Sequence, residues 1–143
     1  PRTKALIGFT DEKEVVLGDV TIRPGKTNLG WSTIAITLLE GENFSSPAHA
    51  LLIATGQTEN TGMRWTNEKK NSVSTQWGSS PVCTECVSFE IGLPVPAFRV
   101  EVFALDTRGN PVKKCEVHEK EGKALIRSSG DTETMWYEIR IRQ

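Results

Sequence analysis

The segment STIAITLL, residues 32–39, decides the fold class of this chain. It is rich in β-branched residues and apolar on both faces, which is typical of a central strand of a sheet. A second apolar run, AHALLIAT at residues 48–55, is short for a helix and is followed by Gly56. We therefore expect a second strand that ends at Thr55 and Gly56.

Alternation of apolar and polar residues predicts further strands along the rest of the chain. They are expected at residues 4–9, with Ala5, Ile7 and Phe9 on one side; at 14–17 and 20–22; at 82–91, where Val87, Phe89 and Ile91 alternate with Ser88 and Glu90; at 98–105, with Phe98, Val100 and Val102 on one side; and at 135–142, where Met135, Tyr137, Ile139 and Ile141 oppose Trp136, Glu138, Arg140 and Arg142. Turn signals occupy residues 106–111 and 119–122, and the second closes a hairpin onto residues 123–126. Strands at this spacing, without helical periodicity, predict an antiparallel all-β sandwich of jelly-roll or immunoglobulin-like topology.

Length and charge limit the classes of partner. The 143 residues suit a single domain spanning residues 1–143. The formal net charge is -1 at pH 7 and the basic residues are spread along the chain, so we expect no nucleic-acid partner. No apolar run approaches the ~18–20 residues of a membrane span, so we expect no membrane partner. The chain opens with PRTKALIGF, which we interpret as a piece excised from a longer protein.

One long polar stretch interrupts the predicted strands. Residues 56–81, GQTENTGMRWTNEKKNSVSTQWGSSP, contain two of the four tryptophans and almost no aliphatic residue. Structureless connections of this length are uncommon in compact domains, and disordered segments are poor in aromatics. We therefore expect an ordered loop, or a loop with a hairpin, that has a role at the surface. Aromatic rings among amide, hydroxyl and guanidinium groups suit a sugar, whose C–H face stacks while its hydroxyls form hydrogen bonds.

The catalytic motifs that can be recognised in a single sequence are missing. The chain has two histidines, His49 and His118, and neither lies beside a nucleophile motif. Glu40, Glu42, Glu59 and Glu85 are interpreted as surface acids, because nothing in their spacing pairs them across a cleft. We predict that the domain is not an enzyme and needs no cofactor.

The three cysteines give a weak zinc-like pattern. Cys83 and Cys86 have C-x2-C spacing, and Cys115 and His118 have C-x2-H spacing. Residues three apart on a strand face opposite sides, which opposes a shared metal. The favoured interpretation is one or two buried free thiols, or one bridge from Cys115 to Cys83 or Cys86, and no metal site is predicted.

The tryptophans are the candidate ligand contacts, each with a structural alternative. Trp65 and Trp77 either bind a sugar or pin the long loop to the sandwich, and one could anchor while the other binds. Trp136 and Tyr137 face opposite ways, so one of them points outward; Trp136 is either a flat contact surface or packs across strands. Trp31, at the start of a central strand, is expected to pack in the core or at its rim.

Three segments resemble a known class of domain. They are LGDVTIRPGKTNLGWSTIAITLLEG, ALLIATGQTENTGMRW and TMWYEIRIRQ, and the most specific pieces are residues 54–65 (ATGQTENTGMRW) and 135–139 (MWYEI). Over residues 18–142 the chain is similar to the β-sandwich domains that follow the catalytic domains of modular bacterial glycoside hydrolases. The resemblance implies a non-catalytic accessory domain of a secreted, polysaccharide-degrading enzyme.

Together, the residues and the resemblance predict a carbohydrate-binding module that keeps its parent hydrolase on polysaccharide. Trp65 or Trp77 would stack on a pyranose ring, with Trp136 as a further flat surface, while Asn60, Arg64, Asn67 and Gln76 would bind hydroxyls. The alternative is a structural domain that docks on the catalytic domain of the same chain through the long loop. A third hypothesis has loop acids complete a cleft of the parent enzyme.

Overall fold

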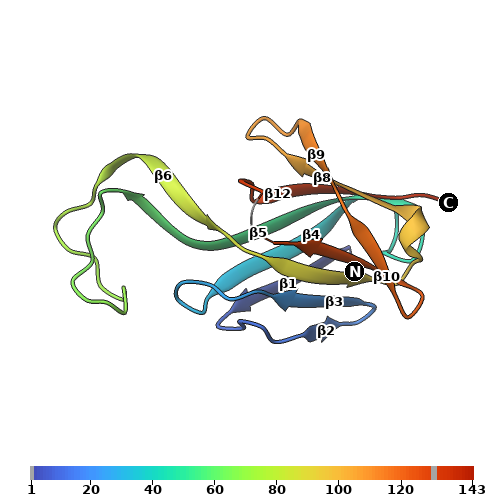
Figure 1. Cartoon of the computed structure of the whole chain (residues 1–143), viewed down its shortest axis with the longest axis horizontal. Coiled ribbons are helices and arrows are strands. Elements are labelled where there is room, and N and C mark those ends of the chain that lie inside the picture. The colour runs from blue at the N-terminus through green and yellow to red at the C-terminus, as the bar shows by residue number, and fades with distance from the viewer. Residues whose placement is uncertain (1, 130–131) are drawn as a thin grey trace.

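The computed structural model describes residues 2–129 and 132–143 and shows an antiparallel all-β sandwich, as the sequence predicts (Figure 1). The larger sheet has the order β1 (Thr3–Gly8), β4 (Ser32–Glu40), β5 (Ala48–Thr61), β12 (Trp136–Ile141), β8 (Val100–Leu105) and β9 (Pro111–Cys115), with β6 (Ser79–Cys86) paired to β5. The smaller sheet has the order β10 (Val117–Lys120), β11 (Lys123–Ser128), β7 (Phe89–Leu93), β3 (Val20–Pro24) and β2 (Val15–Leu17). A 3-10 helix, η1 (Ala97–Arg99), precedes β8. None of the described segments is a helix long and apolar enough to span a membrane.

One hydrophobic core fills the space between the two sheets. Ile34 and Ile36 of β4 and Leu52 of β5 are fully buried, so the two central strands predicted from sequence are confirmed. Phe89 of the smaller sheet meets Tyr137 of the larger sheet edge to face, with ring centroids 5.1 Å apart. Each aliphatic side chain of this kind stabilises the fold by about 1.5–3 kcal/mol relative to an exposed one.

Two apolar side chains near strand ends face solvent. In β1 the buried residue is Leu6, so Ile7 points outward with 64% of its surface exposed. Phe98 was expected to share a buried side with Val100 and Val102, and this is wrong. Phe98 lies in η1, where the strand alternation does not apply, and it is 81% exposed.

The predicted end of the second central strand at Thr55 and Gly56 is also wrong. β5 continues to Thr61 and pairs with β6, and this hairpin projects beyond the sandwich, to the left in Figure 1. We call residues 56–86 the arm. The polar stretch is therefore a loop with a hairpin, one of the two forms expected from its sequence.

A bulge lets β5 pass from the sandwich into the arm. The pairing of β5 with β6 shifts between Thr55 and Thr58, which leaves the N–H of Gln57 outside the regular ladder. The carboxylate of Glu85 accepts this N–H at 3.1 Å. A Cβ added to Gly56 would lie 2.5 Å from Glu85 Oε2, so a larger residue here would have to displace this carboxylate.

The chain changes sheets directly after the arm. β6 belongs to the larger sheet and β7 to the smaller one, and Val87 and Ser88 connect them. The carbonyl of Ser88 accepts the N–H of Gly25 at 2.7 Å, which ties this crossover to the end of β3. The predicted burial of Val87, Phe89 and Ile91 is confirmed.

Candidate functional site

The end of the arm is a second, smaller hairpin that we call the hook, residues 62–78. Gly78 allows the chain to bend closely here, because a Cβ on it would lie 2.4 Å from the carbonyl oxygen of Thr61. Beyond the bend, Trp65 and Val73 form a bridge, and the N–H of Thr66 donates to the carbonyl of Ser72 at 2.9 Å. The hook is thus an ordered hairpin.

One carboxylate fastens the hook to β5. Glu59 Oε2 accepts the indole N–H of Trp65 at 2.7 Å and the amide of Gln57 at 2.7 Å. Lys70 Nζ lies 3.2 Å from the same oxygen. The hydrogen bond from Trp65, followed by that from Lys70, lowers the pKa of Glu59 below its usual range. The carboxylate therefore stays charged and draws the tip of the hook back toward β5.

The loop between β3 and β4 is also held by hydrogen bonds to carboxylates. Asp11 accepts the N–H and the hydroxyl of Thr27, both at 2.9 Å. Glu85, the carboxylate that also satisfies the bulge, accepts the N–H of Asn28 at 2.7 Å. Two carboxylates thus tie the loop to the β1–β2 connection and to the arm, so Trp31 at its end has a fixed position.

The hook and this loop border a groove of about 590 Å³. Four separate parts of the chain contribute: the end of β1, the β3–β4 loop, β5 and the tip of the hook. Its lining residues are Phe9, Asn28, Leu29, Trp31, Gln57, Lys69, Lys70 and Asn71. Phe9 is 75% exposed, and Trp31 is half-buried.

The composition of the groove matches the needs of a polyhydroxylated ligand. Trp31, Phe9 and Leu29 offer apolar surface, and three amide side chains and two ammonium groups offer hydrogen bonds. Asn71 Oδ1 accepts a hydrogen bond of 2.8 Å from the side-chain amide of Asn67, and this bond fixes the orientation of the Asn71 side chain. The groove is therefore apolar on one part of its wall and rich in fixed polar groups on the rest.

The seven predicted ligand residues lie outside this lining. Six belong to the arm, and several have internal roles: Trp65 binds Glu59, Asn60 donates to the carbonyl of Trp77 at 3.0 Å, and Asn67 holds Asn71. Arg64 and Gln76 are exposed and are joined through a backbone hydrogen bond of 2.9 Å.

The two arm tryptophans have different environments. Trp65 is half-buried with its N–H bonded, whereas Trp77 is 64% exposed. This difference agrees with the alternative in which one ring anchors the loop and the other is available to a ligand. The seventh predicted residue, Trp136, lies on the outer face of the larger sheet opposite Ile53, half-buried, while Tyr137 is buried.

Sequence reasoning missed the residues that line the groove. Trp31 was expected to pack in the core or at its rim, and Phe9 was seen only as part of an alternating strand. One signal was available for Trp31: it follows Gly30, which has a φ of +73°, so it sits at the exit of a turn. No feature of the sequence predicted that the tip of the hook lines the same groove as Trp31.

The cysteines do not form a metal site. Among the described residues, no group of three or more His, Cys, Asp and Glu side chains is placed to hold an ion. Cys83 and Cys86 are exposed because β6 lies in the arm, so neither of them is a buried thiol. Cys115 is half-buried in β9, at the far edge of the larger sheet, and forms no disulfide with either of them.

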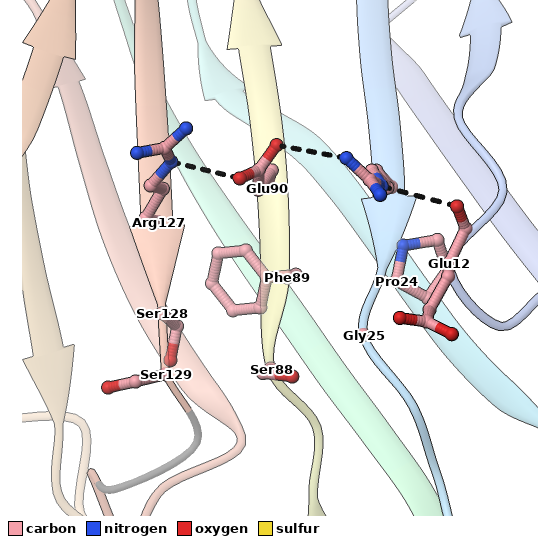
Figure 2. A pocket seen from close by; sticks show the side chains of 10 residues that line it. Glu12, Pro24, Gly25, Ser88, Phe89, Glu90, Arg127, Ser128 and Ser129 are labelled. Atoms are coloured by element: carbon pink, nitrogen blue, oxygen red, sulfur yellow. Dashed lines mark hydrogen bonds and ion pairs between the residues drawn. The ribbon is translucent and has the colours of Figure 1, made fainter.

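A second hollow lies on the smaller sheet and has a different character (Figure 2). Its floor is a charged row in which Arg127 Nε lies 2.9 Å from Glu90 and Arg23 Nη1 lies 4.0 Å from the same carboxylate. Arg23 also donates to the carbonyl of Glu12 at 3.2 Å. Its aromatic residue, Phe89, is buried in the core. The hollow therefore offers charges that neutralise one another and no ring for stacking.

Comparison with protein-family models, with curated proteins and with solved structures finds no match for this chain. The function of this chain must therefore be inferred from the chemistry of its surface. Of the two hollows described above, the groove beside the hook is the one that combines exposed aromatic surface with fixed polar groups.

Proposed function

We propose that this domain is a non-catalytic carbohydrate-binding module that keeps a parent glycoside hydrolase on its polysaccharide. The observation that carries the proposal is the groove in which Trp31 and Phe9 lie beside the amides of Asn28, Gln57 and Asn71. The resemblance to accessory domains of secreted bacterial hydrolases agrees with it. The proposed partners are a polysaccharide and the catalytic domain of the same polypeptide.

In the proposed binding mode, a pyranose ring lies against the indole of Trp31 and its hydroxyls meet the amides. The tethers from Asp11 and Glu85 fix the β3–β4 loop before the ligand arrives, which lowers the entropic cost of binding. Affinity at one such site should be modest, because stacking and solvated hydrogen bonds each yield little net free energy.

The arm offers a place for the polysaccharide to continue. Trp77 is exposed, and Arg64 and Gln76 lie beside each other in the hook. In the proposal, a polysaccharide that extends along the hook has these side chains as secondary contacts. Trp77, Arg64 and Gln76 therefore remain predicted ligand residues, whereas Trp65, Asn60 and Asn67 hold the hook in shape.

Affinity electrophoresis and calorimetry against cellulose, xylan, mannan, β-glucan and polygalacturonate test the proposal. Trp31→Ala should weaken binding more than about fivefold, as loss of a tryptophan at the centre of a site does. Trp136→Ala is the matched control, because Trp136 lies on the same sheet outside the groove. Absence of retardation on every polymer would refute carbohydrate binding.

A second candidate function has one observation in its favour. The arm exposes Trp77 and 61% of Val82, and an apolar projection of this kind suits docking on another protein. In this version the arm holds the domain against the parent catalytic domain. Iodide quenching separates the two: docking predicts that Trp77 is protected in the full-length parent and accessible in the isolated domain, whereas glycan binding predicts protection only after sugar is added.

A further inference from the structure

We infer that the groove selects an acidic polysaccharide, in which an anionic group on the sugar pairs with the ammonium of Lys69. The inference rests on the proposed function and names the class of glycan for the same site. Lys69 and Lys70 both line the groove, and none of the described lining residues carries a carboxylate.

The nearby acids are already occupied by the protein. Glu59 is bound to Trp65, Gln57 and Lys70, Glu85 accepts the N–H groups of Asn28 and Gln57, and Asp11 accepts Thr27. These carboxylates lie behind the lining of the groove and position its walls, and their oxygens accept hydrogen bonds from protein donors. They are therefore poor partners for a sugar hydroxyl; Lys70 offsets the charge of Glu59, whereas Asp11 and Glu85 keep their negative charge.

The two lysines differ in whether their ammonium groups are paired with a carboxylate of the protein. Lys70 is paired with Glu59 at 3.2 Å and has a left-handed backbone with a φ of 50° at the tip of the hook. Lys69 is exposed, and none of the ion pairs formed within residues 2–129 and 132–143 includes it. Glu68 precedes Lys69 in the turn and does not line the groove. The lining of the groove therefore contains one cation that forms no ion pair with the described residues, together with the aromatic residues Trp31 and Phe9.

A ligand with matching chemistry has an apolar ring face for Trp31, hydroxyls for the amides and a negative charge for Lys69. A chain of uronic acids has all three, and a sulfated galactan has the same set with a sulfate as the anion. A neutral glucan or xylan can accept a hydrogen bond from Lys69 but forms no ion pair with it, so it gains less from this side chain.

The probes are sodium oligogalacturonate, its fully methyl-esterified form and a sulfated galactan oligosaccharide, measured by calorimetry at low and at physiological salt. The methyl ester has the same sugar rings without the charge. We expect the acidic form to bind more tightly than the ester by about fivefold, the upper range for one solvent-exposed ion pair, and this advantage should shrink as salt screens the charge.

Variants locate the effect. Lys69→Ala should remove the preference for the acid, because it weakens binding of the acid more than binding of the ester, and Lys69→Glu should reverse the preference. Lys69→Arg keeps the charge and should restore the preference. Lys123→Ala is the matched control, because Lys123 is an exposed lysine of β11 outside the groove.

The outcomes separate the two levels of the proposal. Equal binding of acid and ester, with Lys69→Ala silent, overturns the acidic-glycan inference and leaves carbohydrate binding intact. Failure of all three probes and of the neutral polymers overturns the proposed function itself. Tighter binding of the sulfated galactan than of oligogalacturonate, lost in Lys69→Ala, supports the inference and assigns the anion as sulfate.

Discussion

The sandwich and the arm are built from the same strands but are stabilised in different ways. In the sandwich, β4 and β5 bury apolar side chains against the opposite sheet. In the arm, β5 and β6 have no second sheet to cover them, and the contacts that shape this region come from the carboxylates of Glu59 and Glu85. An apolar core thus supplies the stability of the sandwich, whereas half-buried carboxylates set the position of the surface that we propose binds sugar.

The sharpest way to break the comparison is to remove one core side chain. Ile36→Ala leaves a cavity between the sheets and should lower the free energy of unfolding by about 2–5 kcal/mol. Val82→Ala in the arm, where the side chain is mostly exposed, should change it by less than about 0.5 kcal/mol. Urea unfolding followed by circular dichroism checks both, and equal losses would contradict the division into core and arm.

A smaller effect is expected where the arm leaves the sandwich. Glu85→Ala removes the acceptor of the N–H groups of Gln57 and Asn28, and we expect a loss of about 1–3 kcal/mol because hydrogen bonds to a charged group are at stake. The same variant should weaken sugar binding, because the β3–β4 loop and Gln57 of β5, which both border the groove, lose their hydrogen bonds to Glu85. Thr58→Ala is the control: Thr58 is exposed, lies where pairing with β6 resumes after the bulge, and loses only a surface contact with the hydroxyl of Thr84, so this variant should change neither stability nor sugar binding appreciably.

If Glu85→Ala destabilises the domain but leaves sugar affinity unchanged, the carboxylate supports the fold alone. Gly56→Ala gives an independent check, because its Cβ would displace the same carboxylate without removing it. Glu85→Ala and Gly56→Ala should therefore both lower the free energy of unfolding and weaken sugar binding.

Acid should loosen the hook before it unfolds the sandwich. The pKa of Glu59 is lowered in the folded state, so its contribution is complete above the pKa of the unfolded chain and is lost as the pH falls through the lower, folded value. We expect a change in tryptophan fluorescence below pH about 4, as the bond from Trp65 is lost. In Glu59→Gln this transition should be absent; its persistence would assign it to another group.

The smallest effect is expected in the charged row of the smaller sheet. Glu90→Gln breaks the ion pair with Arg127 and that with Arg23, but these groups are partly exposed and such pairs contribute about 0–1 kcal/mol. Sugar affinity should be unaffected, and calorimetry of this variant provides the check. A clear loss of affinity would move the binding site to the hollow in Figure 2.

The sandwich was largely predictable from sequence because burial on one side of a strand leaves a two-residue period. Val87, Phe89 and Ile91 show it, and so do Tyr137 and Ile139. The rule failed at Phe98, where the chain forms a 3-10 turn, and at Gly56, where a bulge continues the strand through residues that resemble a turn.

The groove could not be predicted in this way. Its walls come from Phe9, Trp31, Gln57 and Lys69, which lie on four segments far apart in the chain. They are brought together by contacts such as that between Trp65 and Glu59, which depend on the geometry of the hook. The arm was nevertheless predicted to have a role at the surface, because two tryptophans in a long polar stretch are unusual in a disordered or purely connecting segment.

The most direct measurement is an NMR titration that follows the indole N–H signals of the four tryptophans, assigned with single Trp→Phe variants. Oligogalacturonate and a neutral xylo-oligosaccharide are added in turn. Binding in the groove predicts that the signal of Trp31 shifts with ligand while that of Trp136 stays in place. A signal of Trp31 that does not move with any glycan, whether Trp136 responds or all four remain unchanged, would contradict a carbohydrate site between the hook and the sandwich.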